Sequence, residues 1–263
     1  MTTRPRPVSP VGNRSAGRVG HPPLERSREL GEGWAQPTPP RSDDETSAGR
    51  NRYAPWALAA FALAALGDLA GVAAGSDLAH TVLKPLLMPT LALYVVFSGG
   101  PRLLVAALAF GWGGDTLLLA DADPAFLAGM VSFAAGHVCY LALFRRHGTG
   151  HPRARGAGLV LAYGAALGVT VALLWPDLPA DMRIPVAGYS LLLTAMAGGA
   201  TTLGLTAATG GALFLLSDTL IATDVADWPQ APRPDFWIML TYLAAQALLA
   251  RSVLTSGSAA ARR

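Results

Sequence analysis

The sequence predicts an all-α, polytopic membrane protein with eight transmembrane helices. Of its 263 residues, 52% are apolar and 14% are charged, whereas soluble domains carry about 25% charged residues. The charge is also uneven, because every glutamate precedes residue 54 and the chain contains only one lysine. Beyond residue 54 the sequence consists of apolar runs near the ~20 residues that a bilayer-crossing helix needs. These observations exclude an ordinary soluble enzyme, a collagen and a disordered protein.

Composition divides the chain into three segments. Residues 1–52 are rich in Pro, Gly, Ser and Arg, so they bury too little apolar surface to offset the entropy of ordering and are predicted to form a disordered cytoplasmic tail. Residues 53–254 are the predicted eight-helix transmembrane domain, and residues 255–263 are a short basic C-terminal tail. No signal peptide is expected, because the first long apolar run begins near Pro55 and not directly after a short basic start.

Eight apolar runs are long enough to cross a bilayer, and residues typical of turns separate most of them. In chain order, the predicted spans are 55–75, 80–98, 101–120, 125–144, 157–175, 183–203, 205–223 and 235–252. The breaks that follow the second to fifth spans and the seventh are Gly99-Gly100-Pro101, Asp123-Pro124, the loop 147–156, Trp175-Pro176 and Trp228-Pro229. The weakest boundary separates the sixth and seventh spans, because residues 200–205 contain little polar character.

The distribution of arginine predicts the orientation of these spans. Arginines gather in the N-terminal tail, at Arg102, in the loop 145–156 and at the C-terminus, whereas the opposite loops carry mainly aspartate. Because basic residues stay on the cytoplasmic side, both termini are predicted to be cytoplasmic, in the plasma membrane, and eight spans satisfy this parity. The sequence pI of about 9.3 therefore reflects membrane topology, and no binding of nucleic acid is expected.

Two pairs of segments in the chain resemble each other, and the members of the first pair are 103 residues apart. Gly114–Asp121 reappears as Ser217–Asp224, and in the following spans Ser132–His137 resembles Thr241–Gln246. The pattern indicates two parallel four-helix repeats; the alternative is chance similarity between apolar helices. In a true repeat, Asp115 and Asp218 are counterparts that face one shared interior.

Ionisable side chains inside the spans are few, and each costs about 2.5–3.5 kcal/mol to insert, so such residues mark function or a necessary partner. Lys84, the only lysine, either extends its ammonium group to the outer interface or pairs with a buried carboxylate. Asp115 and Asp218 each lie about five residues, or roughly 8 Å, from the outer ends of their spans. These three candidate catalytic residues are predicted to form one charged cluster, which serves either to lock the helices or to perform acid–base chemistry.

Further polar side chains on the fourth, sixth, seventh and eighth spans are candidates for the same cavity. A histidine in mid-membrane is either an interhelical hydrogen-bonding group or a catalyst, and tyrosines in membrane helices often only pack. The candidate substrate-binding residues are His137, Tyr140, Tyr189, Ser217, Tyr242 and Gln246. His80 and Asp68 are interpreted as residues near the outer interface.

Several common chemistries find no support in the sequence. A nucleophile elbow, a phosphate-binding loop and a dinucleotide fingerprint are absent from any suitable context. The single cysteine, Cys139, excludes a disulfide framework and a cysteine-based metal site. A zinc site needs three protein ligands, and only His137 and His80 are candidates, so no metal or other cofactor is expected.

The order of several short motifs resembles a known family. These motifs are Lys84-Pro85-Leu86, Gly114-Asp115, Phe133 with Gly136-His137 and Tyr140, Gly211-Ala212-x-Phe214 before Ser217-Asp218, and Tyr242 with Gln246. Over roughly residues 54–254 the chain resembles the YhhN and transmembrane-protein-86 family of lysoplasmalogenases. The resemblance implies a multi-pass hydrolase that takes a lysophospholipid from the membrane and cleaves its vinyl ether bond. The products would be a fatty aldehyde and glycerophosphoethanolamine or glycerophosphocholine.

The residues suit this chemistry. A vinyl ether is hydrolysed by protonation of its terminal alkene carbon, which requires a neutral carboxylic acid and a nearby anion that stabilises the oxocarbenium ion. We expect Asp115 and Asp218 to divide these roles, with Lys84 keeping one of them ionised; the sequence leaves open which aspartate is the acid. The alternatives are a transporter or lipid-binding protein without turnover, and a metal-dependent intramembrane lipid amidase.

Overall fold

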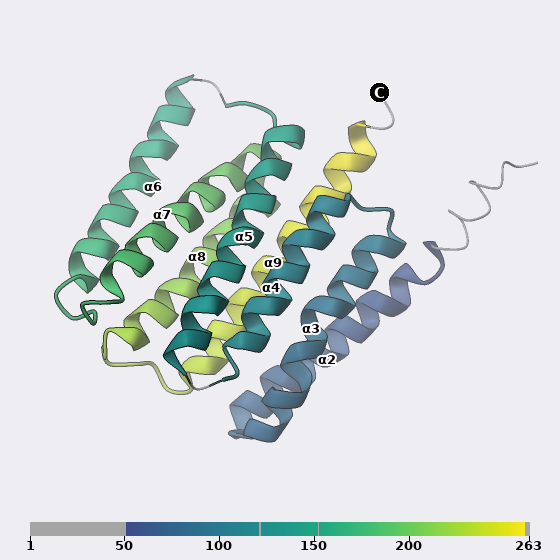
Figure 1. The fold of residues 1–263 in the computed structure, drawn as a ribbon. Helices are drawn as coiled ribbons and strands as arrows, with labels where there is room; N and C mark the ends of the chain where they lie inside the picture. Colours follow the sequence, from purple (N-terminus) through teal and green to yellow (C-terminus); the bar gives the residue numbers. More distant parts are fainter. Residues whose placement is uncertain (1–50, 121, 152, 261–263) are drawn as a thin grey trace, which may run out of the picture. The chain divides into compact units, whose positions relative to one another are not determined.

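The computed structural model describes residues 51–120, 122–151 and 153–260. Over these residues the chain forms eight α-helices and one short 3₁₀ helix, without a β-strand (Figure 1), which confirms the all-α prediction. The helices are α2 (Ala54–Ala74), α3 (Asp77–Phe97), α4 (Arg102–Leu117), α5 (Asp123–His147), α6 (Arg153–Leu174), α7 (Arg183–Ala200), α8 (Leu205–Val225) and α9 (Pro234–Ala260), with η1 at Thr201–Leu203. Residues 1–50 of the predicted tail and residues 261–263 lie outside the described residues.

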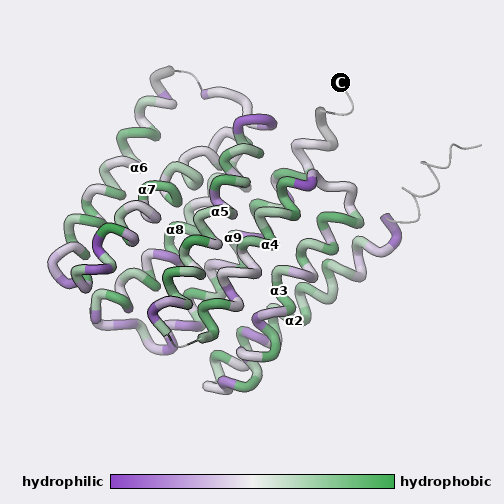
Figure 2. The backbone as a smooth tube through the Cα atoms, viewed as in Figure 1, coloured by the Kyte–Doolittle hydropathy of each residue, from purple (hydrophilic) through white to green (hydrophobic). Residues whose placement is uncertain are grey.

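The chain is a multi-pass membrane protein. Seven of the described helices are long and apolar enough to cross a membrane, and Figure 2 shows hydrophilic residues mainly at helix ends and in loops. The eighth helix, α4, has 16 residues and ends before the predicted boundary at residue 120. After Leu117 the backbone tightens, because the N–H groups of Leu119 and Ala120 donate to carbonyl groups three residues earlier.

Of two further boundaries, the one between the sixth and seventh predicted spans lies between residues 203 and 205 as predicted, and the end of the last helix differs from the prediction. The weak break between the sixth and seventh spans contains η1 and then Gly204, whose φ of 103° is readily adopted only by glycine. Helix α9 continues to Ala260, so the first residues of the predicted C-terminal tail, 255–260, are helical. Both boundaries concern the ends of helices and leave the order of the eight helices unchanged.

The packing is tightest toward α9 and loosest at α6. Helix α9 contacts α2, α3, α5 and α8 and lies among the other helices in Figure 1. Helix α6 lies at the edge beside α7 (Figure 1), and of its described side chains only Leu174 is buried. A Cβ on Gly158 or Gly168 of this helix would meet nothing within 4 Å. Most of the α6 surface therefore faces lipid.

The α4–α5 and α8–α9 pairs cross in the same register. A Cβ on Gly136 of α5 would lie 3.2 Å from the carbonyl oxygen of Ala107, and a Cβ on Gly210 of α8 would lie 3.2 Å from that of Ala245. These contacts join counterparts in the alignment of the two half-sequences, since Ala107 corresponds to Gly210 and Gly136 to Ala245. In the same alignment, Gly114 corresponds to Ser217 and Gly129 to Ile238. Gly114 lies close to Gly129, and Ser217 forms a hydrogen bond with Ile238. Equivalent close approaches at equivalent positions support an internal repeat of these two helix pairs.

Candidate active site

A cavity of about 120 Å³ lies among helices α3 to α9. Its walls are mostly apolar side chains such as Phe126, Met130 and Leu193. Six residues predicted from the sequence line it, namely Lys84, Asp115, Tyr189, Ser217, Asp218 and Tyr242. The counterparts Asp115 and Asp218 thus face one interior, as expected from the repeat.

The other predicted residues lie behind this lining and form the first of two hydrogen-bond chains. The Tyr242 hydroxyl donates to Asp115 Oδ2 at 2.8 Å. Gln246 Nε2 donates to the Tyr242 oxygen at 3.3 Å, and Gln246 Oε1 accepts from the Tyr140 hydroxyl at 2.6 Å. All four residues are buried. Tyr140 and Gln246 do not line the cavity and are connected to it through Tyr242; their role in substrate binding stays a prediction.

The second chain leads to Asp218. The Tyr189 hydroxyl donates to Asp218 Oδ2, and His137 Nε2 lies 3.0 Å from the Tyr189 oxygen. While the Tyr189 hydroxyl donates to Asp218, it can only accept from His137, so Nε2 is then the donor. His137 is 1% exposed, and its Nδ1 has no hydrogen-bond partner within the described part of the chain. His137, like Gln246, is therefore connected to the cavity through a tyrosine.

Glycines of α4 allow these helices to approach closely enough for the chains to form. A Cβ on Gly111 would lie 3.2 Å from both Gln246 Nε2 and the Tyr242 hydroxyl oxygen. A Cβ on Gly114 would lie 2.5 Å from the ring of Phe133. Any larger residue at either position would push α9 or α5 away from α4. The glycine-rich stretch of α4 thus positions the polar groups around Asp115.

Lys84 and Ser217 line the cavity in ways that the sequence did not predict. Lys84 is within electrostatic range of Asp115, but among the described residues it forms no ion pair with a nitrogen–oxygen distance of 4.0 Å or less. Of the two alternatives for Lys84, direct pairing with a carboxylate is therefore not formed among the described residues, and its ammonium group interacts with Asp115 at longer range. The Ser217 hydroxyl donates to the carbonyl oxygen of Ile238 at 3.1 Å, so its proton holds α8 against α9.

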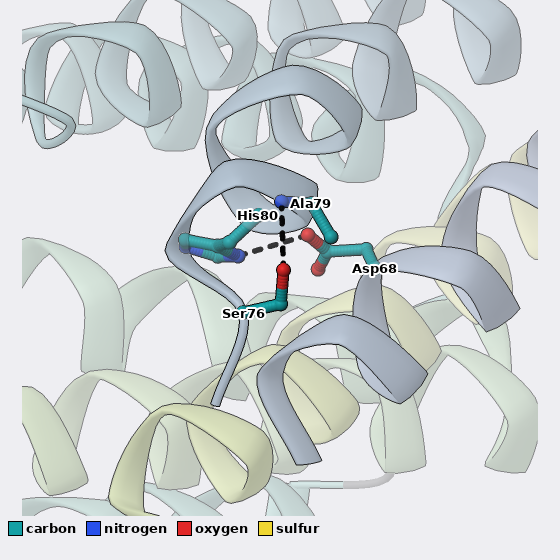
Figure 3. Close-up of polar contacts among 4 residues, drawn as sticks. All are labelled: Asp68, Ser76, Ala79 and His80. Carbon is teal, nitrogen blue, oxygen red and sulfur yellow. Dashed lines mark hydrogen bonds and ion pairs between the residues drawn. The ribbon is translucent and has the colours of Figure 1, made fainter. Parts of the chain in front are cut away.

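Two polar groups of this region were missed or misread in the sequence. Thr194 on α7 lines the cavity and its buried hydroxyl oxygen has no partner among the described residues. Asp68, interpreted as interfacial, is 0% exposed, and its Oδ1 accepts from His80 Nδ1 at 2.8 Å (Figure 3). A tight turn with Gly75 at φ 72° brings α2 and α3 together and makes this pair possible.

The comparison with known proteins can now be set beside this geometry. Residues 79–253 match the model of the YhhN family. The chain belongs to the YhhN family. It is 38% identical to the protein named lysoplasmalogenase TMEM86B of Homo sapiens, over 60% of this chain and 67% of that protein. It is also 34% identical to lysoplasmalogenase TMEM86B of Sus scrofa, over 65% of this chain and 73% of the relative. No solved structure matches the chain.

The matched region of this YhhN-family chain contains the whole cavity. All the lining residues and both hydrogen-bond chains fall within 79–253, and so does His80, whereas Asp68 precedes it. Among the residues that the structure describes, no group of three or more His, Cys, Asp or Glu side chains is placed to hold a metal ion. The ionisable side chains that line the YhhN-family cavity are two aspartates, two tyrosines and one lysine, and serine and threonine hydroxyls lie beside them.

Proposed function

We propose that this membrane protein hydrolyses the vinyl ether bond of lysoplasmalogens to a fatty aldehyde and a glycerophospho-base. The single observation that carries the proposal is the pair Asp115 and Asp218 in one largely apolar cavity. Family membership and the names of the related proteins support it. The cavity suits an amphiphile, because it offers carboxyl groups to the reacting ether and apolar walls to the hydrocarbon chain.

The two carboxyl groups can supply the proton donor and the anion that the reaction needs. Each accepts a tyrosine proton on Oδ2, and neither makes a further hydrogen bond through Oδ1 within the described part of the chain, which leaves that oxygen for substrate or water. One carboxyl group in the acid form protonates the alkene carbon that is not bonded to oxygen. The other, as a carboxylate, stabilises the positive charge that develops on the alkene carbon bonded to oxygen. Water then adds to this carbon, and the hemiacetal collapses.

Lys84 contributes a positive charge at the edge of this site. Its side chain lines the cavity and lies within electrostatic range of Asp115. In the proposed reaction the ammonium group stabilises Asp115 as an anion, and it attracts the phosphate of the lipid substrate. The apolar residues of α5 to α8 that line the same cavity are the proposed contacts of the alkenyl chain.

The proposed location is the plasma membrane, with both termini in the cytoplasm. The support for this topology is the concentration of arginine at one set of loops, including Arg102, Arg145 and Arg146, and of aspartate at the opposite loops. Protease protection of N-terminal and C-terminal epitope tags in intact and permeabilised cells tests it. Cleavage of either tag in intact cells would contradict this orientation.

The activity is tested by measuring fatty-aldehyde release from lysoplasmenylethanolamine by the purified full-length protein in EDTA. The matched acyl lysolipid is the substrate control, Asp218→Asn is the inactive variant, and Asp77→Asn, which removes an exposed carboxylate on α3, is the matched control variant. We expect aldehyde from the vinyl ether lipid alone, abolished in Asp218→Asn and retained in Asp77→Asn. Lipid binding without turnover would contradict the proposal and favour a lipid-binding or transport protein.

A further inference from the structure

In each of the two hydrogen-bond chains, one residue contacts the tyrosine that donates to the aspartate. These two residues differ in type but occupy equivalent positions. His137 on α5 and Gln246 on α9 are counterparts in the alignment of the two half-sequences. Gln246 supports Asp115 through Tyr242, and His137 supports Asp218 through Tyr189. The two tyrosines themselves are not counterparts, because Tyr242 on α9 corresponds to Phe133 and Tyr189 lies on α7. Each carboxyl group therefore has one tyrosine, and the residues at the equivalent positions 137 and 246 that contact these tyrosines differ.

The chain that ends at Asp115 has a fixed direction. Among the residues that the structure describes, the Tyr140 hydroxyl has Gln246 Oε1 as its only acceptor, so the amide group of Gln246 must present its Nε2 to Tyr242. An inverted amide would leave the buried Tyr140 proton without an acceptor, at a cost of about 1–3 kcal/mol. Tyr242 consequently accepts from Gln246 and directs its own proton to Asp115. A carboxyl oxygen that always receives a proton donor is stabilised in its charged form.

The chain that ends at Asp218 can run in either direction. His137 Nε2 donates to Tyr189 in one tautomer, and in the other it accepts the Tyr189 proton, because Nδ1 has no partner among the described residues that would hold one form. In the second arrangement Tyr189 accepts from a protonated Asp218. The Asp218 carboxyl group is also an electrostatic neighbour of Asp115, and two adjacent carboxyl groups resist being ionised together.

From these two arrangements we infer that Asp218 carries the proton that attacks the alkene carbon, while Asp115 remains the carboxylate that stabilises the oxocarbenium ion. Gln246 and His137 are the positioning residues that impose this division. The inference rests on the proposed function and names the acid, which the proposed function leaves open.

The division gives a balanced reaction. Asp218 transfers its proton to the alkene carbon that is not bonded to oxygen, the π electrons of the C=C bond form the new C–H bond, and Asp218 becomes a carboxylate. Water bonds to the oxocarbenium carbon and returns one proton to Asp218. In the collapse of the hemiacetal, Asp218 protonates the departing glycerol oxygen and recovers the hydroxyl proton as the aldehyde forms. One water is consumed, and Asp218 ends the cycle protonated while Asp115 stays ionised throughout.

The first test reads the protonation states directly and does not depend on turnover. Infrared spectra of the full-length protein in H₂O and D₂O distinguish a protonated carboxyl group, which absorbs above the amide I band, from a carboxylate. We expect the protonated-carboxyl band of the wild type to disappear in Asp218→Asn and to persist in Asp115→Asn. Disappearance in Asp115→Asn, or equal loss in both variants, would overturn the assignment.

The second test removes the group that can accept the Tyr189 proton. In His137→Leu, Tyr189 has no acceptor behind it and keeps donating to Asp218, so Asp218 should hold its proton less firmly. We expect a weaker protonated-carboxyl band and a kcat about 10-fold lower, as for loss of one hydrogen bond, with KM little changed. Wild-type kcat together with an undiminished band would overturn the role of His137. A merely structural defect would lower kcat without altering the band.

These measurements separate failure of the inference from failure of the proposed function. If the wild type releases no aldehyde, the hydrolase proposal fails, and the infrared spectra still determine which aspartate is protonated. If the wild type is active but the protonated band belongs to Asp115, the hydrolase proposal stands and the division of roles is wrong.

Discussion

Asp115 and Asp218 occupy equivalent positions in the two repeated helix pairs, but their surroundings differ. Asp115 is 2% exposed and has three buried residues arranged behind it. Asp218 is only partly buried and is reached through Tyr189 from a single histidine. The duplicated helix pairs place the two carboxyl groups at equivalent positions, but their tyrosines come from non-equivalent positions, Tyr242 on α9 and Tyr189 on α7, so the surroundings of the two groups are unequal. The following changes test how far that inequality extends.

The largest effect is expected from the aspartates themselves. Asp218→Asn should lower kcat by about 10²–10⁴-fold, because asparagine cannot supply the proton that general acid catalysis requires. The Asp115→Asn/Asp218→Asn double variant should be little slower than the slower single variant, since residues that act as a unit are not additive. Aldehyde release at saturating substrate measures both. Losses that multiply in the double variant would mean that the two carboxyl groups act independently.

A smaller effect is expected from each tyrosine. Tyr242→Phe and Tyr189→Phe remove the one proton donor that each carboxyl group has at Oδ2, which should lower kcat about 10-fold to 100-fold. Tyr163→Phe on α6 is the matched control, because the Tyr163 hydroxyl makes no hydrogen bond among the described residues. Equal activity of all three variants would show that the tyrosines only pack.

The two halves should also differ in stability at an equivalent glycine and serine. Gly114→Ala would place a Cβ 2.5 Å from the Phe133 ring, and such overpacking costs about 1–3 kcal/mol. Ser217→Ala at the equivalent position loses one hydrogen bond to Ile238, or about 1 kcal/mol. Thermal unfolding in detergent measures the change in midpoint for each. A smaller loss for Gly114→Ala than for Ser217→Ala would contradict the tight α4–α5 packing.

The smallest effect is expected on α6. Gly158→Ala introduces a Cβ that meets nothing within 4 Å, and alanine is favoured over glycine inside a helix by about 0.5–1 kcal/mol. The unfolding midpoint should stay the same or rise slightly, with aldehyde release unchanged. A marked loss of stability would mean that α6 packs against another surface in the membrane.

The sequence by itself determined the number, order and membrane character of the helices. Apolar runs of bilayer length allow almost no other spanning structure than a helix, since a helix satisfies its own backbone hydrogen bonds. Local signals also located Lys84, Asp115 and Asp218, because charged residues are rare inside apolar spans. The end of α4 was not predicted, because it depends on local backbone geometry in a stretch without strong turn residues, whereas the break at Gly204 lies at the predicted boundary between residues 203 and 205.

Only the tertiary structure decided which polar residues touch the cavity and which act from behind it. The partners of Tyr140 and His137 lie on helices distant in the sequence, and helical periodicity does not specify how two helices are rotated against each other. The same reason explains the pairing of Asp68 with His80 and the lack of a direct ion pair for Lys84. Residue type and depth follow from the chain alone, whereas the direction of each hydrogen bond follows from how the helices pack.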